Sequence, residues 1–203
     1  MNPAGDNIGV VPEERAMRSA SRYDALVATF VGICALCVSG YTAYMQRQQV
    51  RAAVWPILEF DTSNQPDIHL TLANKGVGPA IIRHVIVTVD GQPVSNWNEA
   101  LARLLGPGTH WFSESDMSGH VLAANESMTI LTPTRDPEGT PIVHNRSDPL
   151  WMEVNKARGR IAVEICYSTL GECWTLRSGG GQTATSTTET RRCPSSSATS
   201  FQQ

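Results

Sequence analysis

This sequence has little that points to catalysis or to nucleic-acid binding. Sixteen basic and nineteen acidic side chains give a net charge of −3, whereas nucleic acid selects a concentrated basic surface. The five histidines follow no H-x-x-x-H, H-x-H or H-E-x-x-H spacing. Gly76-x-Gly78 lacks the third glycine of a dinucleotide-binding loop, since Ile81 stands there, and there is no G-x-S-x-G motif. We therefore predict no nucleic-acid partner, cofactor or metal, and we assign no catalytic residue.

Cysteine is also sparse, which excludes a dense disulfide framework. Cys34 and Cys37 lie inside an apolar run, where a reactive thiolate would have no polar surroundings. Cys166 and Cys173 flank a turn near the end of the predicted domain, and Cys193 follows in the tail. We expect Cys166 and Cys173 either to form a cross-strand disulfide, which needs an oxidising compartment, or to stay reduced as two small buried side chains.

The chain has one long apolar run, Ala25 to Tyr44, without a charged residue. A helix of this length spans roughly 30 Å, the hydrocarbon thickness of a bilayer. The run is longer than a signal-peptide core and no clean cleavage site follows it. We predict an uncleaved signal anchor: a flexible arm at 1–22, a single-pass transmembrane helix at 23–46 and a helical neck at 47–55 that ends at Trp55-Pro56.

The charges on either side of the run indicate its orientation. Three arginines precede it, at positions 15, 18 and 22, and two follow it, at positions 47 and 51. The positive-inside rule then favours an N-terminus in the cytoplasm and a domain on the other face of the membrane.

Small side chains recur along the predicted span at helical spacing. Gly32, Ala35, Ser39 and Ala43 fall on one face of a helix, and such faces let two helices approach closely in lipid. Besides the bilayer itself, the partner predicted from this face is another membrane protein or a second copy of the chain. The alternative is that small residues are simply common in membrane spans.

The sequence pattern of residues 56–177 predicts a mostly β domain of the immunoglobulin-like sandwich type with one short lid helix. Short strands separated by turn signals, without a repeating β-helix-β pattern, favour this class. The expected strands are 57–61, 68–72, 81–89, 110–112, 120–122, 127–131, 160–167 and 173–177. The lid helix is expected at 97–105, capped by Asn96, and 150–154 has no assigned type. The Gly/Ser/Thr-rich tail at 178–203 is predicted to be disordered.

The last predicted hairpin has two possible registers. A four-residue loop at 168–171 places Cys166 opposite Cys173, whereas a two-residue loop at Leu170-Gly171 makes them diagonal neighbours. Both registers keep the apolar residues of the hairpin on one face, so hydrophobicity does not choose between them.

Three stretches together resemble a group of small bacterial single-pass membrane-anchored proteins of unknown function. They are RQQVRAAVWP at 47–56, NKGVGPA at 74–80, and the pair Cys166-Tyr167 and Glu172-Cys173-Trp174. The second stretch and the strand after it are also similar to immunoglobulin-like adhesion modules. The resemblance implies a bacterial inner membrane and carries over no catalytic residue.

The function predicted from these features is that of a membrane-tethered, non-enzymatic binding or accessory module. The alternative is a membrane-anchored enzyme, a hydrolase, with a site in the loop from His110 to His120. That site would need several of His110, Glu114, Asp116 and His120 to converge.

Overall fold

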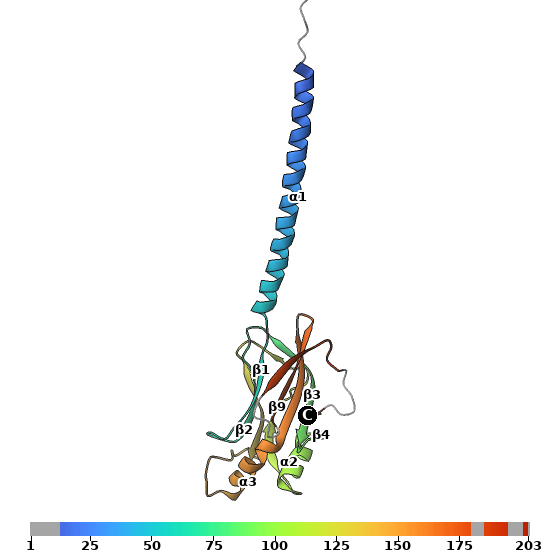
Figure 1. Ribbon diagram of the computed structural model, residues 1–203. Helices are drawn as coiled ribbons and strands as arrows, with labels where there is room; N and C mark the ends of the chain where they lie inside the picture. Colours follow the sequence, from blue (N-terminus) through green and yellow to red (C-terminus); the bar gives the residue numbers. More distant parts are fainter. Residues whose placement is uncertain (1–12, 180–184, 195–200, 203) are drawn as a thin grey trace, which may run out of the picture. The chain divides into compact units, whose positions relative to one another are not determined.

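A computed structural model describes residues 13–179, 185–194 and 201–202 (Figure 1). The chain divides into two compact units, Met1–Arg51 and Ala52–Gln203. The first unit consists of most of helix α1, and the second is a domain built mainly from β-strands.

Helix α1 runs without interruption from Glu13 to Ala53. Among the described residues, the part of it from Arg22 to Ala53 is long and apolar enough to cross a membrane. Residues 47–53 are the last part of this helix, which ends just before Trp55-Pro56. The predicted arm is corrected in part, because residues 13–22 continue the helix, while 1–12 lie outside the described residues.

The domain contains two antiparallel sheets. The first has the order β1-β2-β7-β5, and the second has the order β10-β9-β8-β3-β4, with β6 paired to β3. The strands are β1 (Leu58–Ser63), β2 (His69–Asn74), β3 (Ala80–Val89), β4 (Gln92–Val94), β5 (Trp111–Glu114), β6 (Val121–Leu122), β7 (Ser127–Thr134), β8 (Ile161–Thr169), β9 (Glu172–Gly179) and β10 (Ser186–Thr190).

One hydrophobic core is shared by residues of both sheets. Alternation along the strands supplies it, because every second side chain of a strand points to the same face. Leu70 and Leu72 of β2 are buried as predicted, and Ile165 and Tyr167 of β8 come from the other sheet. Strand β3 lies centrally, with β8 on one side and β4 and β6 on the other, as its apolar residues on both faces predict.

Helix α2 (Trp97–Leu105) forms where the capping signals place it. Asn96 Oδ1 accepts a hydrogen bond from the backbone N–H of Glu99, 2.9 Å away, and the Glu99 carboxylate accepts one from the N–H of Ser95. These bonds satisfy donors that a helix N-terminus leaves open. Trp97, Leu101 and other residues of its apolar face are buried in the core.

A second helix in the domain, α3 (Pro149–Ala157), corrects the prediction of a single lid helix. Asp148 caps it by accepting from the N–H of Leu150, and Pro149 occupies its first turn. Trp151 and Val154 pack with Ile68 and Ile142 in a small second core. Both start signals are present in the sequence. Only three buried apolar positions follow them, Trp151, Val154 and Ala157, and this repeat is too short to separate helix from strand. A short 3₁₀ turn, Arg158–Arg160, leads from α3 into β8.

Asn74, at the end of β2, holds the loop from 75 to 79 against the start of the domain. Its side-chain oxygen accepts from the N–H groups of Ile57 and Gly76, and its Nδ2 donates to the carbonyl of Gly78. The loop also donates from Val77 N to Trp55 O over 3.0 Å. The Asn74 side chain is fully buried, so these bonds replace those it would make with water.

Candidate functional site: the cysteine pocket and the C-terminal segment

The described cysteines pair differently from the sequence prediction. Cys166 of β8 forms a disulfide with Cys193, with a Cα–Cα separation of 5.6 Å, and Cys173 is a free thiol. The predicted pair of Cys166 and Cys173 is therefore wrong, as is the alternative that both are reduced. Cys166 is buried but lies outside the shared core, since its neighbours Ile165 and Tyr167 point to the opposite face of β8.

The register of the last hairpin explains the correction. Thr169 pairs with Glu172 around the two-residue turn Leu170-Gly171, so Cys173 lies opposite Ser168 and diagonal to Cys166. Diagonal neighbours lie about 7–8 Å apart, whereas disulfides need Cα atoms within roughly 7 Å and Cβ atoms much closer. Cys193 approaches Cys166 from outside the sheet, at the distance a disulfide requires.

The tail predicted to be disordered is ordered in its described parts. Strand β9 extends to Gly179, and β10 pairs with it from Ser186 to Thr190. Residues 180–184, 195–200 and 203 lie outside the described residues. Residues 191–194 lead to the disulfide, and Phe201 joins the shared core with 3% of its surface exposed.

Phe201 fills an opening at the edge of β3. Strand β6 pairs with Ala80 and Ile81, and β4 pairs with residues from Val87 onward. The backbone between them therefore has no strand partner on that side among the described residues. Phe201 N donates to Val85 O over 3.0 Å, and Gln202 N donates to Ser95 O over 2.8 Å. An isolated phenylalanine in a Gly/Ser/Thr-rich tail was the sequence signal for this contact, but it does not say where the ring binds.

The free thiol and the disulfide share an open pocket of about 420 Å³. Its lining includes Cys173 and Cys193, and two cations, Arg83 and Arg192. Arg83 Nε donates to Ser168 Oγ over 2.9 Å, which fixes one guanidinium at the pocket wall. Two guanidinium groups suit a phosphate or carboxylate ligand.

The four residues predicted for a hydrolase site have different surroundings. His110 lines a smaller cavity of about 60 Å³, whose lining includes none of the other three, and its Nε2 lies 2.9 Å from the carbonyl oxygen of Gly106. Asp116 Oδ1 accepts from the N–H of Ser118, and Glu114 and His120 are exposed. In the part of the chain that the structure describes, no group of three His, Cys, Asp or Glu residues could hold a metal ion.

The predicted helix-packing face on α1 lies within the apolar part of that helix. Ala35 and Ser39 are linked by a hydrogen bond from the Ser39 hydroxyl to the Ala35 carbonyl, 2.7 Å long, which satisfies the hydroxyl within the helix. No heavy atom lies within 4 Å of an added Cβ at Gly32, so a partner helix could approach there. Self-association or pairing through this face stays a prediction.

The chain matches no protein-family model, no curated protein and no solved structure. The resemblance to small bacterial membrane-anchored proteins therefore stays an expectation from the sequence.

Proposed function

We propose that this protein is a single-pass, membrane-tethered binding module of the bacterial inner membrane, without enzymatic activity, whose β domain lies in the periplasm. The Cys166–Cys193 disulfide is the observation that carries the proposal. Structural disulfides persist in oxidising compartments such as the periplasm and are rare in the cytoplasm. The excess of arginines before the span favours the same orientation.

The strand order supports an immunoglobulin-like fold for the domain. Strands β1-β2-β7-β5 follow the order A-B-E-D, and β9-β8-β3-β4 follow G-F-C-C′, of immunoglobulin sheets. The usual inter-sheet disulfide is replaced here, because Cys166 bonds outward to Cys193. Domains with this architecture are common on cell surfaces, which fits a binding role.

The binding surface that we propose is the outer edge of β10. Along an antiparallel strand, successive residues direct their backbone N–H and C=O groups alternately to one neighbouring strand and to the other. The two residues that flank a two-residue turn direct theirs at each other. Counting from Thr169 and Glu172, residues 173, 175 and 177 direct their backbone groups toward β10. Thr187 and Glu189 of β10 then direct theirs outward.

This edge has few features that protect against further pairing, since Glu189 is the one charged residue of the five in β10. The five residues of β10 include no proline, no lysine and no bulge, and edges of this kind accept an added strand. An extended segment of a partner protein would pair with the outward N–H and C=O groups of Thr187 and Glu189.

Two variants at one position test the edge. Glu189→Pro removes the outward N–H, and Glu189→Ala removes the same carboxylate but keeps the N–H. The full chain is purified from its native membranes in mild detergent, and the proteins that co-purify are compared. We expect wild type and Glu189→Ala to retain the same partner and Glu189→Pro to lose it. Equal recovery with all three chains, or no partner with any of them, would overturn the proposed edge.

The side of the membrane is tested with the free thiol. A membrane-impermeant maleimide should label Cys173 in cells with an opened outer membrane and an intact inner one, and Cys173→Ser should abolish the label. Labelling that requires lysis of the inner membrane would place the domain in the cytoplasm and refute the proposed orientation.

A further inference from the structure

One end of the domain exposes apolar side chains where the chain enters from α1. We call it the entry end and define it as residues 54–57, 74–83, 120–126, 168–173 and 190–194. Trp55, Val77 and Leu170 are 52%, 62% and 72% exposed there. Exposed large apolar residues grouped at one end indicate a surface that contacts something apolar.

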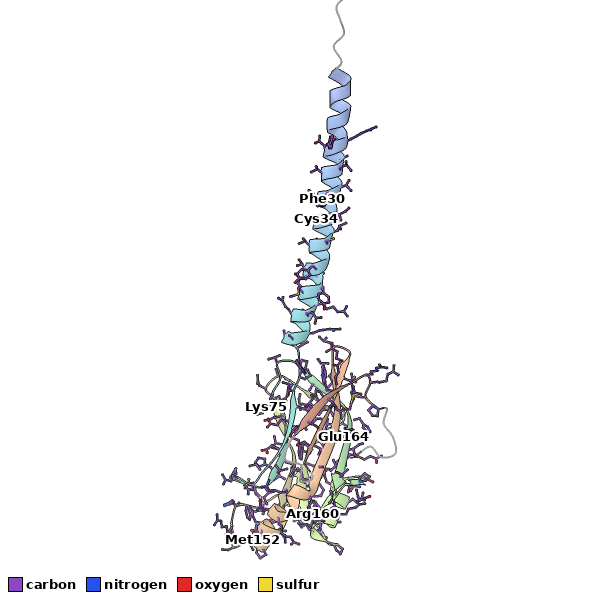
Figure 2. The ribbon with its side chains drawn as sticks, viewed as in Figure 1. Phe30, Cys34, Lys75, Met152, Arg160 and Glu164 are labelled. Carbon is purple, nitrogen blue, oxygen red and sulfur yellow. A yellow bond between two sulfur atoms is a disulfide. The ribbon has the colours of Figure 1, made fainter. Side chains whose placement is uncertain are left out.

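Hydrogen bonds and strand register bring these segments to the same end. Val77 N bonds to Trp55 O, and Ile81, at the start of β3, pairs with Ser168, just before the turn that carries Leu170. Figure 2 shows Lys75, of the 75–79 loop, and Met152, of α3, toward opposite ends of the domain. Met152 therefore provides a position remote from the entry end.

Leu170 is an unusual residue for its position. It has φ +42° and precedes Gly171 with φ +85° in a two-residue hairpin turn, where asparagine or aspartate is the common choice. A leucine there has an unfavourable backbone conformation and leaves its side chain in water. A residue that violates local preference in two ways is a candidate for a functional contact.

The entry end is also basic. Within its ranges lie four basic side chains, Lys75, Arg83, Arg191 and Arg192, and two acidic ones, Glu126 and Glu172. Glu126 uses one carboxylate oxygen to accept from Ala123 N. Arg83 and Arg192 line the 420 Å³ pocket beside Leu170. Basic side chains next to apolar ones match the chemistry of an anionic membrane surface, with phosphate above and hydrocarbon below.

We propose that the entry end docks on the bilayer that anchors the chain. Trp55, Val77 and Leu170 enter the interfacial layer, and Arg83 and Arg192 contact the phosphates of anionic lipid headgroups. This inference rests on the proposed role of α1 as a membrane anchor. Arg47 and Arg51 follow the apolar run, at positions where basic residues commonly reach the headgroups of the nearer leaflet. Trp55 is only four residues farther along the chain than Arg51.

The docked domain would present its remaining surface in a fixed orientation. Strand addition at β10 would then take place close to the membrane, since Thr190, the last residue of β10, is followed directly by Arg191 and Arg192 at the entry end. The bilayer, and not the partner protein, would determine how the outer edge of β10 is oriented relative to the membrane.

Tryptophan fluorescence in vesicles tests the docking. The full chain is reconstituted in phosphatidylcholine vesicles with and without phosphatidylglycerol, carrying a nitroxide label near the headgroup or deep in the acyl chain. Leu170→Trp places a probe at the entry end, and Met152→Trp places one at the remote end. The five native tryptophans contribute the same background to both variants.

We expect the shallow label to quench Leu170→Trp strongly and Met152→Trp no more than the wild type. Quenching should increase with phosphatidylglycerol, and Arg192→Gln should lower the ratio of docked to free domain about fivefold, since one basic residue near an anionic surface contributes about that factor. Leu170→Asn, measured with the native tryptophans alone, should reduce shallow quenching of their fluorescence below that of the wild type. It should keep the thermal transition, because Asn-Gly suits this turn.

Equal quenching of the two probes in a chain that resists alkaline carbonate extraction would overturn the docking and leave the anchor intact. Release of the chain by carbonate would instead refute the anchor, on which the docking rests. Quenching that does not depend on phosphatidylglycerol would refute the proposed contact of Arg83 and Arg192 with anionic headgroups.

Discussion

Phe201 packs edge-on against Trp97, with ring centroids 5.0 Å apart and ring planes at 70°. The two residues are 104 positions apart in the sequence, yet both lie in the shared core of the domain. The C-terminal segment is therefore part of the fold at two points, the disulfide at Cys193 and the aromatic contact at Phe201.

Replacing Phe201 by alanine should destabilise the domain. Its ring is buried against Trp97, and truncating a buried phenylalanine costs about 3 kcal/mol or more. Urea unfolding of the full chain in detergent would measure the loss, with Phe201→Leu as a milder control. An unchanged transition in Phe201→Ala would show that the ring does not contribute to the core in solution.

Removing Cys193 should weaken the same region, and removing Cys173 should not. The disulfide links residues 27 positions apart, and closing a loop of this size stabilises a protein by about 3 kcal/mol. Cys193→Ser should lower the midpoint of thermal unfolding by the same amount as a reductant does in the wild type. Peptide mapping after alkylation under native conditions should find the label on Cys173, with Cys166 and Cys193 joined. A Cys166–Cys173 peptide would contradict the pairing.

Gly78→Ala should disturb the entry of the chain into the domain. A Cβ at this position would lie 1.9 Å from the carbonyl oxygen of Val54, closer than any real contact, so the loop or the neck must move. We expect a loss of at least about 2 kcal/mol, in the range of backbone and packing errors in a core. Gly108→Ala is the matched control, because its added Cβ meets nothing closer than 4.0 Å. Similar stability of the two variants would contradict the close contact between Gly78 and the Val54 carbonyl.

Stability should fall at alkaline pH in a way that depends on Tyr167. Burial raises the pKa of the Tyr167 hydroxyl above its usual value of 10.0. The folded state therefore holds this proton at pH values where the unfolded state releases it. The contribution of Tyr167 to the free energy of unfolding is complete below about pH 10. It is lost as the pH rises through the higher pKa of the folded state. Urea unfolding from pH 8 to 11 should show a shallower decline for Tyr167→Phe than for the wild type, and parallel declines would argue against a buried hydroxyl.

Several elements follow from local sequence alone. The charge-free run from Ala25 to Tyr44 predicts an apolar helix, and Asn96 with Glu99 predicts the start of α2, because these signals act between residues at most a few positions apart. Asp90-Gly91 likewise predicts the turn between β3 and β4, where both residues have positive φ. The pattern of many short strands also predicted a mostly β domain.

The sequence therefore determined which segments are apolar, which are turns, and where the main helix and most strands lie. Only the tertiary structure decided the register at Leu170-Gly171, the partner of Cys166 and the position of Phe201. Both hairpin registers bury the same apolar face, so local hydrophobicity favours neither. The contacts of Cys193 and Phe201 join parts of the chain 27 and about a hundred residues apart, and their free energy depends on a surface that exists only once the two sheets have packed.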